Sequence, residues 1–115
     1  MEENSYKKLV RLFEQSDLPK KKIDEVISKC VSFKIGKTGM NPEKRGNSPD
    51  YADKYKWIKQ LYESSDPDDV SQMEAHLINT YINRTRCDNE KDGAASIYDH
   101  MSDGATKYYV YIVWR

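Results

Sequence analysis

The chain has 115 residues, of which 33% are charged and 37% are hydrophobic. This length suits a single compact domain with one lean core and excludes a multidomain enzyme. Nineteen basic and nineteen acidic side chains cancel, so the chain lacks the net positive charge that steers many proteins to DNA. It has no run approaching the roughly 18 apolar residues of a membrane helix, and its polar start has no secretory signal. We therefore expect an intracellular, cytoplasmic protein without a membrane partner.

The charges are unevenly distributed along the chain. Basic side chains outnumber acidic ones over residues 6–45, whereas acidic side chains outnumber basic ones over residues 63–103. A basic region of this kind can contact a phosphate backbone, although charged runs more often form solvated surface. The distribution alone leaves both interpretations open.

The chain is expected to begin with a pair of helices. Apolar residues recur at helical spacing over residues 5–15, and a polar break at residues 16–19 places Pro19 in the first turn of a second helix. A core-facing stripe at i, i+3, i+4 and i+7 follows in this second helix; it consists of Ile23, Val26, Ile27 and Cys30. We treat residues 1–30 as a helical extension and residues 31–115 as the core of one domain.

Strand-like and helix-like patterns alternate in the middle of the chain. The β-branched and aromatic residues of segment 31–35 predict a strand, and Gly36 is expected to end it in a tight loop. Residues 41–45 have the asparagine cap and the proline of a helix start. Residues 55–63 suit either a strand or a helix, and we favour the strand.

The last part of the chain predicts a helix, a loop and a strand. Residues 66–69 predict the start of the helix, because they supply an aspartate cap, a proline and two carboxylates near the positive end of the helix dipole. An apolar stripe then continues the helical pattern to Ile82. Residues 83–94 are rich in Asn, Asp and Gly, which is typical of a loop that carries functional groups. The composition of residues 107–114 predicts a final strand inside a sheet. The chain is therefore expected to be an α+β domain.

Five polar side chains in these elements have the chemistry to hydrolyse a phosphodiester bond with one metal ion. A carboxylate can hold Mg²⁺, which prefers oxygen ligands and keeps several of its waters. A guanidinium can bind the scissile phosphate and stabilise its added charge, and a phenol or an amine can help to remove a proton from water. The candidates are Lys34, Arg45, Glu74, Asn89 and Tyr111.

Each candidate also has a plain structural interpretation. An arginine such as Arg45 is commonly a surface residue, Asn89 a turn residue and Tyr111 a packed strand residue. Glu74 is more informative, because it lies one helical turn from apolar residues on either side. An uncompensated carboxylate beside an apolar stripe is costly. A bound metal ion and an edge position with access to solvent would both account for it.

The order of these residues resembles the GIY-YIG nuclease family. Its signature is a hairpin that carries two tripeptides, followed by an arginine on a helix, a metal-binding glutamate on a later helix and an asparagine beyond it. Residues 34–36, Lys-Ile-Gly, resemble the second tripeptide, and residues 33–38 with Pro-Glu-Lys-Arg soon after are similar to the branch common in phage and viral proteins. The resemblance implies a small antiparallel sheet flanked by helices and a Mg²⁺- or Mn²⁺-dependent endonuclease that cuts DNA.

The first tripeptide of the family is displaced in this chain. The region where it normally lies, residues 20–30, has a helical pattern, whereas residues 109–112 look like the missing strand. Because domain termini often lie close together, we expect a circular permutation in which Tyr111 supplies the first tyrosine and the final strand completes the sheet. Lys34 stands in place of the second tyrosine, and strand alternation would turn it away from the apolar face.

The resemblance implies a role for each site residue. Arg45 would clamp phosphate, and Glu74 would hold the metal ion. Asn89 would order the site, while Tyr111 and Lys34 would manage the proton of the attacking water. The basic N-terminal half of the chain would contact the nucleic-acid backbone. These contacts are expected from Lys37, Thr38 and Lys44.

Two other functions remain open. A catalytically degenerate module on the same scaffold could serve a phage or a virus by recognising nucleic acid or a host protein, and the lysine at position 34 favours it. A small interaction domain unrelated to nucleases would place Arg45 and Glu74 on different surfaces. The many tyrosines suit either base stacking or a homodimer. The nuclease interpretation requires Tyr111 and Glu74 to meet in one cleft.

Overall fold

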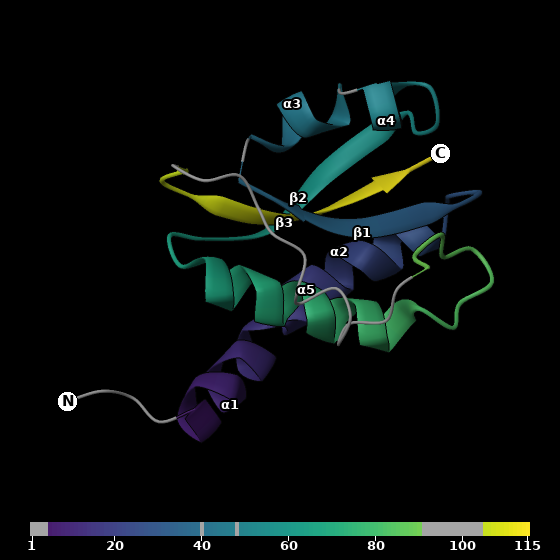
Figure 1. Ribbon diagram of the computed structural model, residues 1–115. Helices are drawn as coiled ribbons and strands as arrows, with labels where there is room; N and C mark the ends of the chain where they lie inside the picture. Colours follow the sequence, from purple (N-terminus) through teal and green to yellow (C-terminus); the bar gives the residue numbers. More distant parts are fainter. Residues whose placement is uncertain (1–4, 40, 48, 91–104) are drawn as a thin grey trace.

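The computed structural model describes residues 5–39, 41–47, 49–90 and 105–115 (Figure 1). The helices and strands of these ranges are, in chain order, α1 (Ser5–Gln15), α2 (Asp17–Ile27), β1 (Phe33–Thr38), α3 (Pro42–Gly46), α4 (Pro49–Ala52), β2 (Trp57–Ser64), α5 (Pro67–Tyr81) and β3 (Tyr108–Trp114). None of these helices combines the length and the apolar composition needed to cross a membrane. The prediction of an α+β domain is confirmed.

β3 is the central strand of a three-stranded antiparallel sheet in the order β1-β3-β2. β1 pairs with β3 from Phe33 opposite Trp114 to Thr38 opposite Tyr109. β2 pairs along the other side of β3 and contains a bulge. The final strand therefore completes the sheet, as predicted, and it does so by lying between the two strands that precede it.

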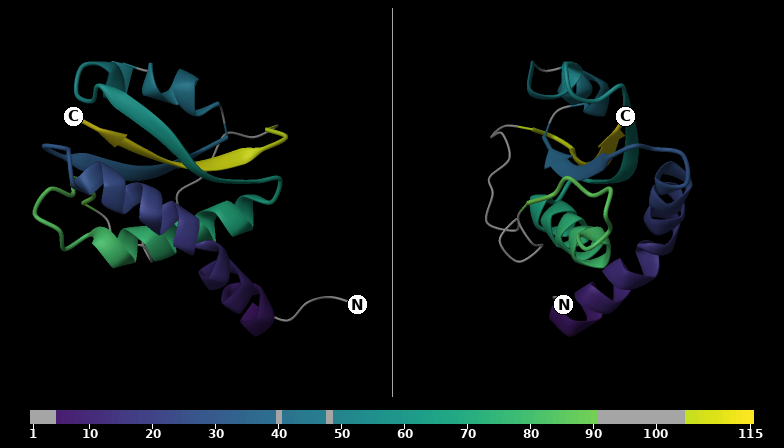
Figure 2. Two further views of the ribbon diagram at one scale, coloured as in Figure 1. Left: turned by 180° about the vertical axis from the view of Figure 1, so that it is seen from behind. Right: turned by 90° about the vertical axis from the view of Figure 1, so that its right-hand side faces the viewer.

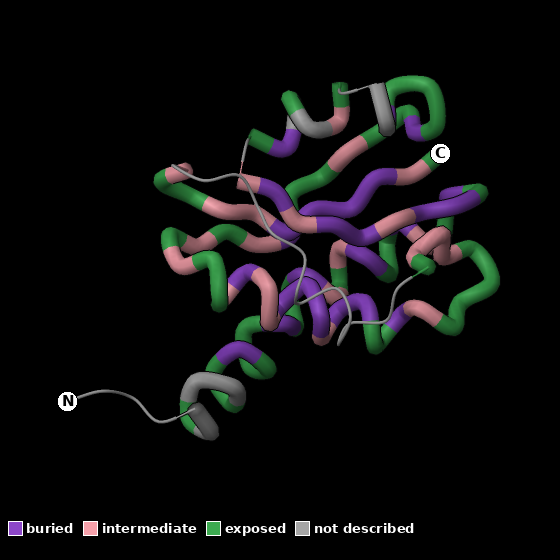
Figure 3. Tube along the Cα trace, in the orientation of Figure 1, coloured by how far each residue is buried: buried purple, intermediate pink, exposed green. Residues whose placement is uncertain are grey.

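Helices cover both faces of the sheet. α5 and α2 lie against one face, and the short helices α3 and α4 lie over the other (Figures 1 and 2). Buried residues concentrate between the sheet and α5 (Figure 3), where the main core includes Phe33, Ile35, Leu77 and Ile112. The apolar stripes predicted for α2 and α5 face this core.

Local chemistry defines the start of α5, the helix that carries Glu74. Asp66 is the N-cap residue, and its side chain accepts a hydrogen bond of 2.9 Å from the N–H of Asp68. Pro67 opens the first turn, where no backbone N–H is required. The predicted start of this helix is confirmed, and the side of α5 that carries Val70, Met73, Leu77, Ile78 and Tyr81 packs into the core.

Gly36 lies inside β1 rather than at its end, so the predicted loop at this position was wrong. The strand continues to Thr38, and Gly36 pairs directly with Tyr111 on β3. A Cβ at Gly36 would overlap the phenol of Tyr111. The position therefore needs a glycine because a neighbouring side chain passes close to the backbone, and not because the chain turns.

Tyr111 connects the sheet to α4. Its hydroxyl oxygen lies 2.8 Å from that of Tyr51, and the two rings meet edge-on with their centroids 5.9 Å apart. Tyr51, Tyr55, Tyr111 and Val113 form a second, smaller core on this face of the sheet. The second core gives the short helix α4, which the sequence patterns did not predict, a defined position.

We expect Gly36→Ala to lower the free energy of unfolding by about 1–3 kcal/mol, because the added methyl group overpacks the contact with Tyr111. In a Tyr111→Leu background the same substitution should cost less, since the phenol is absent. Urea denaturation of the two single variants and the double variant measures this coupling. An equal loss in both backgrounds would contradict the proposed contact.

Candidate functional site

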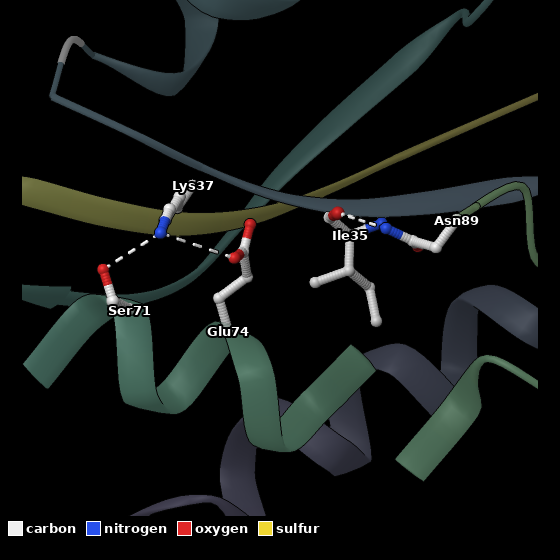
Figure 4. Close-up of polar contacts among 5 residues, drawn as sticks. All are labelled: Ile35, Lys37, Ser71, Glu74 and Asn89. Atoms are coloured by element: carbon white, nitrogen blue, oxygen red, sulfur yellow. Dashed lines mark hydrogen bonds and ion pairs between the residues drawn. The ribbon is translucent and has the colours of Figure 1, made fainter. Parts of the chain in front are cut away.

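The sheet separates Tyr111 from Glu74. Side chains alternate between the two faces of a strand, and Tyr111 belongs to the face covered by α4, next to Tyr51. Glu74 extends from α5 toward the opposite face, where its carboxylate lies 3.9 Å from the ammonium group of Lys37 (Figure 4). The structure therefore does not bring these two groups into one cleft, contrary to the expectation from the sequence.

Glu74 and Lys37 form a buried ion pair. Their side chains are only 5% and 4% exposed, and the Lys37 ammonium also donates a hydrogen bond of 3.0 Å to the hydroxyl of Ser71. A lysine from β1 thus neutralises the carboxylate beside the apolar stripe of α5, which accounts for a carboxylate at that position. The Lys37 ammonium is thus engaged inside the protein, and its contact with nucleic acid stays a prediction.

The described residues around Glu74 do not suit a hydrated magnesium ion. Mg²⁺ keeps several of its waters when a carboxylate binds it, whereas this carboxylate is buried and lies beside an ammonium group. No group of three or more His, Cys, Asp or Glu side chains that could hold a metal ion occurs in the described part of the chain. The described surroundings of Glu74 therefore suit charge neutralisation and packing.

Asn89 closes the outer edge of β1. Its side-chain oxygen accepts a hydrogen bond of 2.9 Å from the N–H of Ile35, and its side-chain nitrogen donates one of 2.8 Å to the Ile35 carbonyl (Figure 4). Backbone bonds extend this pairing, because Phe33 donates to the carbonyl of Arg86 at 2.9 Å and Asp88 donates to the carbonyl of Phe33 at 2.7 Å. The Asn89 amide thus takes the place of a neighbouring strand at the sheet edge.

The other predicted site residues are spread over β1 and α3. Lys34 lies on the same face as Tyr111, as strand alternation predicts, with its ammonium group 5.7 Å from the centre of the Tyr51 ring. Thr38 is buried, which argues against its predicted contact with nucleic acid, whereas Lys44 is exposed. Arg45 belongs to α3, and its side chain lies outside the described residues.

The end of β3 lies beside the beginning of β2 (Figure 1), and aromatic rings and cations gather there. The rings of Trp57 and Trp114 stack with their centroids 6.2 Å apart and their planes inclined by 22°. The Lys56 ammonium lies 6.0 Å from the centre of the Trp57 ring, and the Lys29 ammonium lies 5.7 Å from that of Trp114. We call this surface the aromatic-basic end; it consists of Lys29, Lys54, Lys56, Trp57, Trp114 and Arg115.

The aromatic-basic end is open to solvent. Trp57 is 54% exposed, and the four cations of this surface are exposed as well. Asp88, an acidic side chain close to it, accepts a hydrogen bond of 2.8 Å from the hydroxyl of Tyr55. Burial raises the pKa of the Tyr55 phenol, and the hydrogen bond to Asp88 raises it further. The phenol therefore stays protonated and remains a donor to this carboxylate.

Two short sequence pairs indicate this surface, although the order of the nuclease-like motifs does not. Lys56-Trp57 and Trp114-Arg115 are basic and aromatic pairs at two strand ends. Interleaved rings and cations are typical of surfaces on which bases stack while phosphates are neutralised. The two pairs meet because the sheet register places Trp57 opposite Trp114, and this register is not evident from the sequence.

Comparison with known proteins gives no assignment. No family description matches the chain, and no curated protein or solved structure shows significant similarity to it. The resemblance to the GIY-YIG family therefore stays a prediction that rests on the order of the motifs.

Breaking the buried ion pair should destabilise the protein. We expect Glu74→Gln to lower the free energy of unfolding by about 3–5 kcal/mol, because it removes a buried negative charge that lies 3.9 Å from the Lys37 ammonium. Replacing both partners with apolar residues, as in Lys37→Met with Glu74→Leu, should restore most of this loss. Urea denaturation at neutral pH compares the variants, and a double variant no more stable than Glu74→Gln would argue against the pair.

Proposed function

We propose that the protein is a nucleic-acid-binding module that makes contact through its aromatic-basic end. The observation that carries this proposal is the stack of Trp57 on Trp114, with the ammonium groups of Lys56 and Lys29 over the two rings. A base that stacks on an aromatic side chain contributes about 1–3 kcal/mol with little dependence on sequence. Lysine and arginine side chains beside the rings can neutralise phosphates and release their counterions.

The combination of rings and cations favours a nucleic acid over an acidic protein. An acidic peptide would use the four cations but would not stack on the exposed part of the Trp57 ring. A nucleic acid uses both, because an ammonium group that lies over a ring can move to a phosphate while a base takes its place. The 54% exposure of Trp57 leaves ring area open for this exchange.

Binding without cleavage is the function that the geometry supports best. Tyr111 and Glu74 face opposite sides of the sheet, and the carboxylate lies beside the ammonium group of Lys37. DNA hydrolysis by a GIY-YIG nuclease, with its metal ion and its phage or viral setting, remains a prediction from the order of the motifs. The aromatic-basic end needs none of the predicted catalytic residues.

Removing the exposed ring should weaken binding. We expect Trp57→Ala to reduce the affinity for a single-stranded oligonucleotide by about 5- to 150-fold, the equivalent of one lost base stack. Leu18→Ala serves as the matched control, because Leu18 is a 60% exposed apolar residue on α2 outside the aromatic-basic end. Fluorescence anisotropy of a labelled oligonucleotide measures both affinities. A similar loss in the two variants would contradict the assignment of the surface.

Removing two cations should reduce the salt dependence of binding. We expect Lys29→Ala with Lys56→Ala to lower the slope of log affinity against log salt by about 1.4, since each phosphate contact on a single strand contributes about 0.7. The control pair Lys7→Ala with Lys21→Ala removes the same charge from exposed positions on α1 and α2. Anisotropy at several salt concentrations gives the slopes.

Three results would overturn the proposed function. The first is the absence of salt-dependent binding to both DNA and RNA. The second is an equal effect of the two lysine pairs on the slope. The third is cleavage of supercoiled plasmid by the unaltered protein with Mg²⁺ or Mn²⁺, which would contradict binding without cleavage.

A further inference from the structure

A pocket of about 410 Å³ opens beside the aromatic-basic end, between α3, α4 and β2. Lys56 and Trp57 also line the pocket. Trp114 packs against the main core and pairs with Trp57, whereas Ile58 and Val113 of the pocket belong to the second core on the opposite face of the sheet. The pocket and the stacked rings therefore adjoin only at the strand ends. We propose that this pocket holds one unpaired nucleobase, which makes single-stranded nucleic acid the preferred ligand. The inference rests on the proposed function and adds the class of ligand to it.

The lining of the pocket matches the chemistry of a base. Ala52, Ile58 and Val113 contribute apolar surface, which suits the faces of a planar ring. Asn47 is exposed at the wall, and its amide can both donate and accept a hydrogen bond at the edge of a base. The volume lies within the range of roughly 300–1,000 Å³ that is typical of small-molecule sites.

The surrounding contacts hold the pocket in shape. A Cβ on Gly46 would lie 3.0 Å from the Cγ2 atom of Ile58, so α3 packs closely on β2 along one wall. On another wall, Tyr55 is held by two bonds, one from its N–H to the carbonyl of Tyr51 at 2.8 Å and one from its hydroxyl to Asp88 at 2.8 Å. A site that is ordered before binding loses less entropy when the ligand enters.

The position of the pocket selects against a duplex. A base inside a duplex is stacked and paired, and moving it into a protein pocket costs a few kcal/mol. An unpaired base avoids this cost. Lys56 lines the pocket and is exposed, so a phosphate of the same strand can be neutralised while its base is buried. The phosphates of a duplex could still contact the cations, but without a buried base.

The experiment compares three ligands of equal length at one low salt concentration. They are a labelled ten-nucleotide oligothymidylate, a base-free deoxyribose-phosphate strand and a duplex. We expect the oligothymidylate to bind at least about tenfold more tightly than either of the others, because only it offers unpaired bases. Fluorescence anisotropy gives the three affinities for the full chain.

A variant that fills the pocket separates base burial from stacking on Trp57. Ala52 is exposed at the end of α4, and Ala52→Phe should weaken oligothymidylate binding about tenfold while the base-free strand binds as before. Ala52→Ser keeps the pocket open and should bind like the unaltered protein. If Ala52→Phe lowers the melting temperature, Asn47→Ala provides the same test, because it removes the polar edge contact from an exposed position.

Each outcome bears on one claim. Equal affinity for the three ligands, or an unchanged oligothymidylate affinity in Ala52→Phe and Asn47→Ala, overturns the nucleobase pocket. If binding still depends on Trp57 and on salt in that case, the proposed nucleic-acid function stands. The absence of binding to all three ligands overturns the proposed function together with the pocket.

Discussion

The passage of the Tyr111 ring over Gly36 determines how the second layer of the molecule is built. Because Gly36 has no side chain, the phenol can cross β1 and reach the hydroxyl of Tyr51 at 2.8 Å. Tyr51 in turn accepts the backbone N–H of Tyr55 and packs edge-on against its ring. The short helix α4 thereby gains a defined place on the sheet. These contacts hold Tyr51 and Tyr55 in place, and Tyr55 lies two residues before β2 begins at Trp57.

The aromatic-basic end is assembled from segments that are distant in the sequence. Lys56 donates its backbone N–H to the carbonyl of Trp114 at 3.0 Å, and Val31 donates to the carbonyl of Arg115 at 2.5 Å. The backbone N–H of Arg115 returns a bond of 3.1 Å to the carbonyl of Ser32. These bonds join the beginnings of β1 and β2 to the end of β3, the central strand. The rings and cations therefore share one surface only when the whole sheet is formed.

Local patterns predict the elements, whereas contacts between distant elements decide what particular residues do. α5 follows from a cap, a proline and an apolar stripe that lie close together in the chain. The same local reasoning assigns Gly36 to a turn, because the ring that requires a glycine there comes from Tyr111. It also recognises Glu74 as a carboxylate in need of compensation, but it does not identify Lys37 as the partner. That partner depends on which face of β1 packs on α5, and a single sequence does not reveal this.

The parts of the molecule that stabilise the fold differ from the surface that we propose for nucleic-acid binding. The two faces of the sheet are occupied by cores, one with a buried ion pair and one with hydrogen-bonded tyrosines, so substitutions there act mainly on stability. The aromatic-basic end lies at the strand ends, where Trp57 keeps about half of its surface exposed and the cations remain in solvent. Trp114 packs against the main core, whereas Trp57 and the four cations belong to neither core, so replacing Trp57 or the cations should be mild for folding. If these replacements weaken nucleic-acid binding, the loss would then report the missing contacts and not unfolding, because the rest of the fold would remain intact.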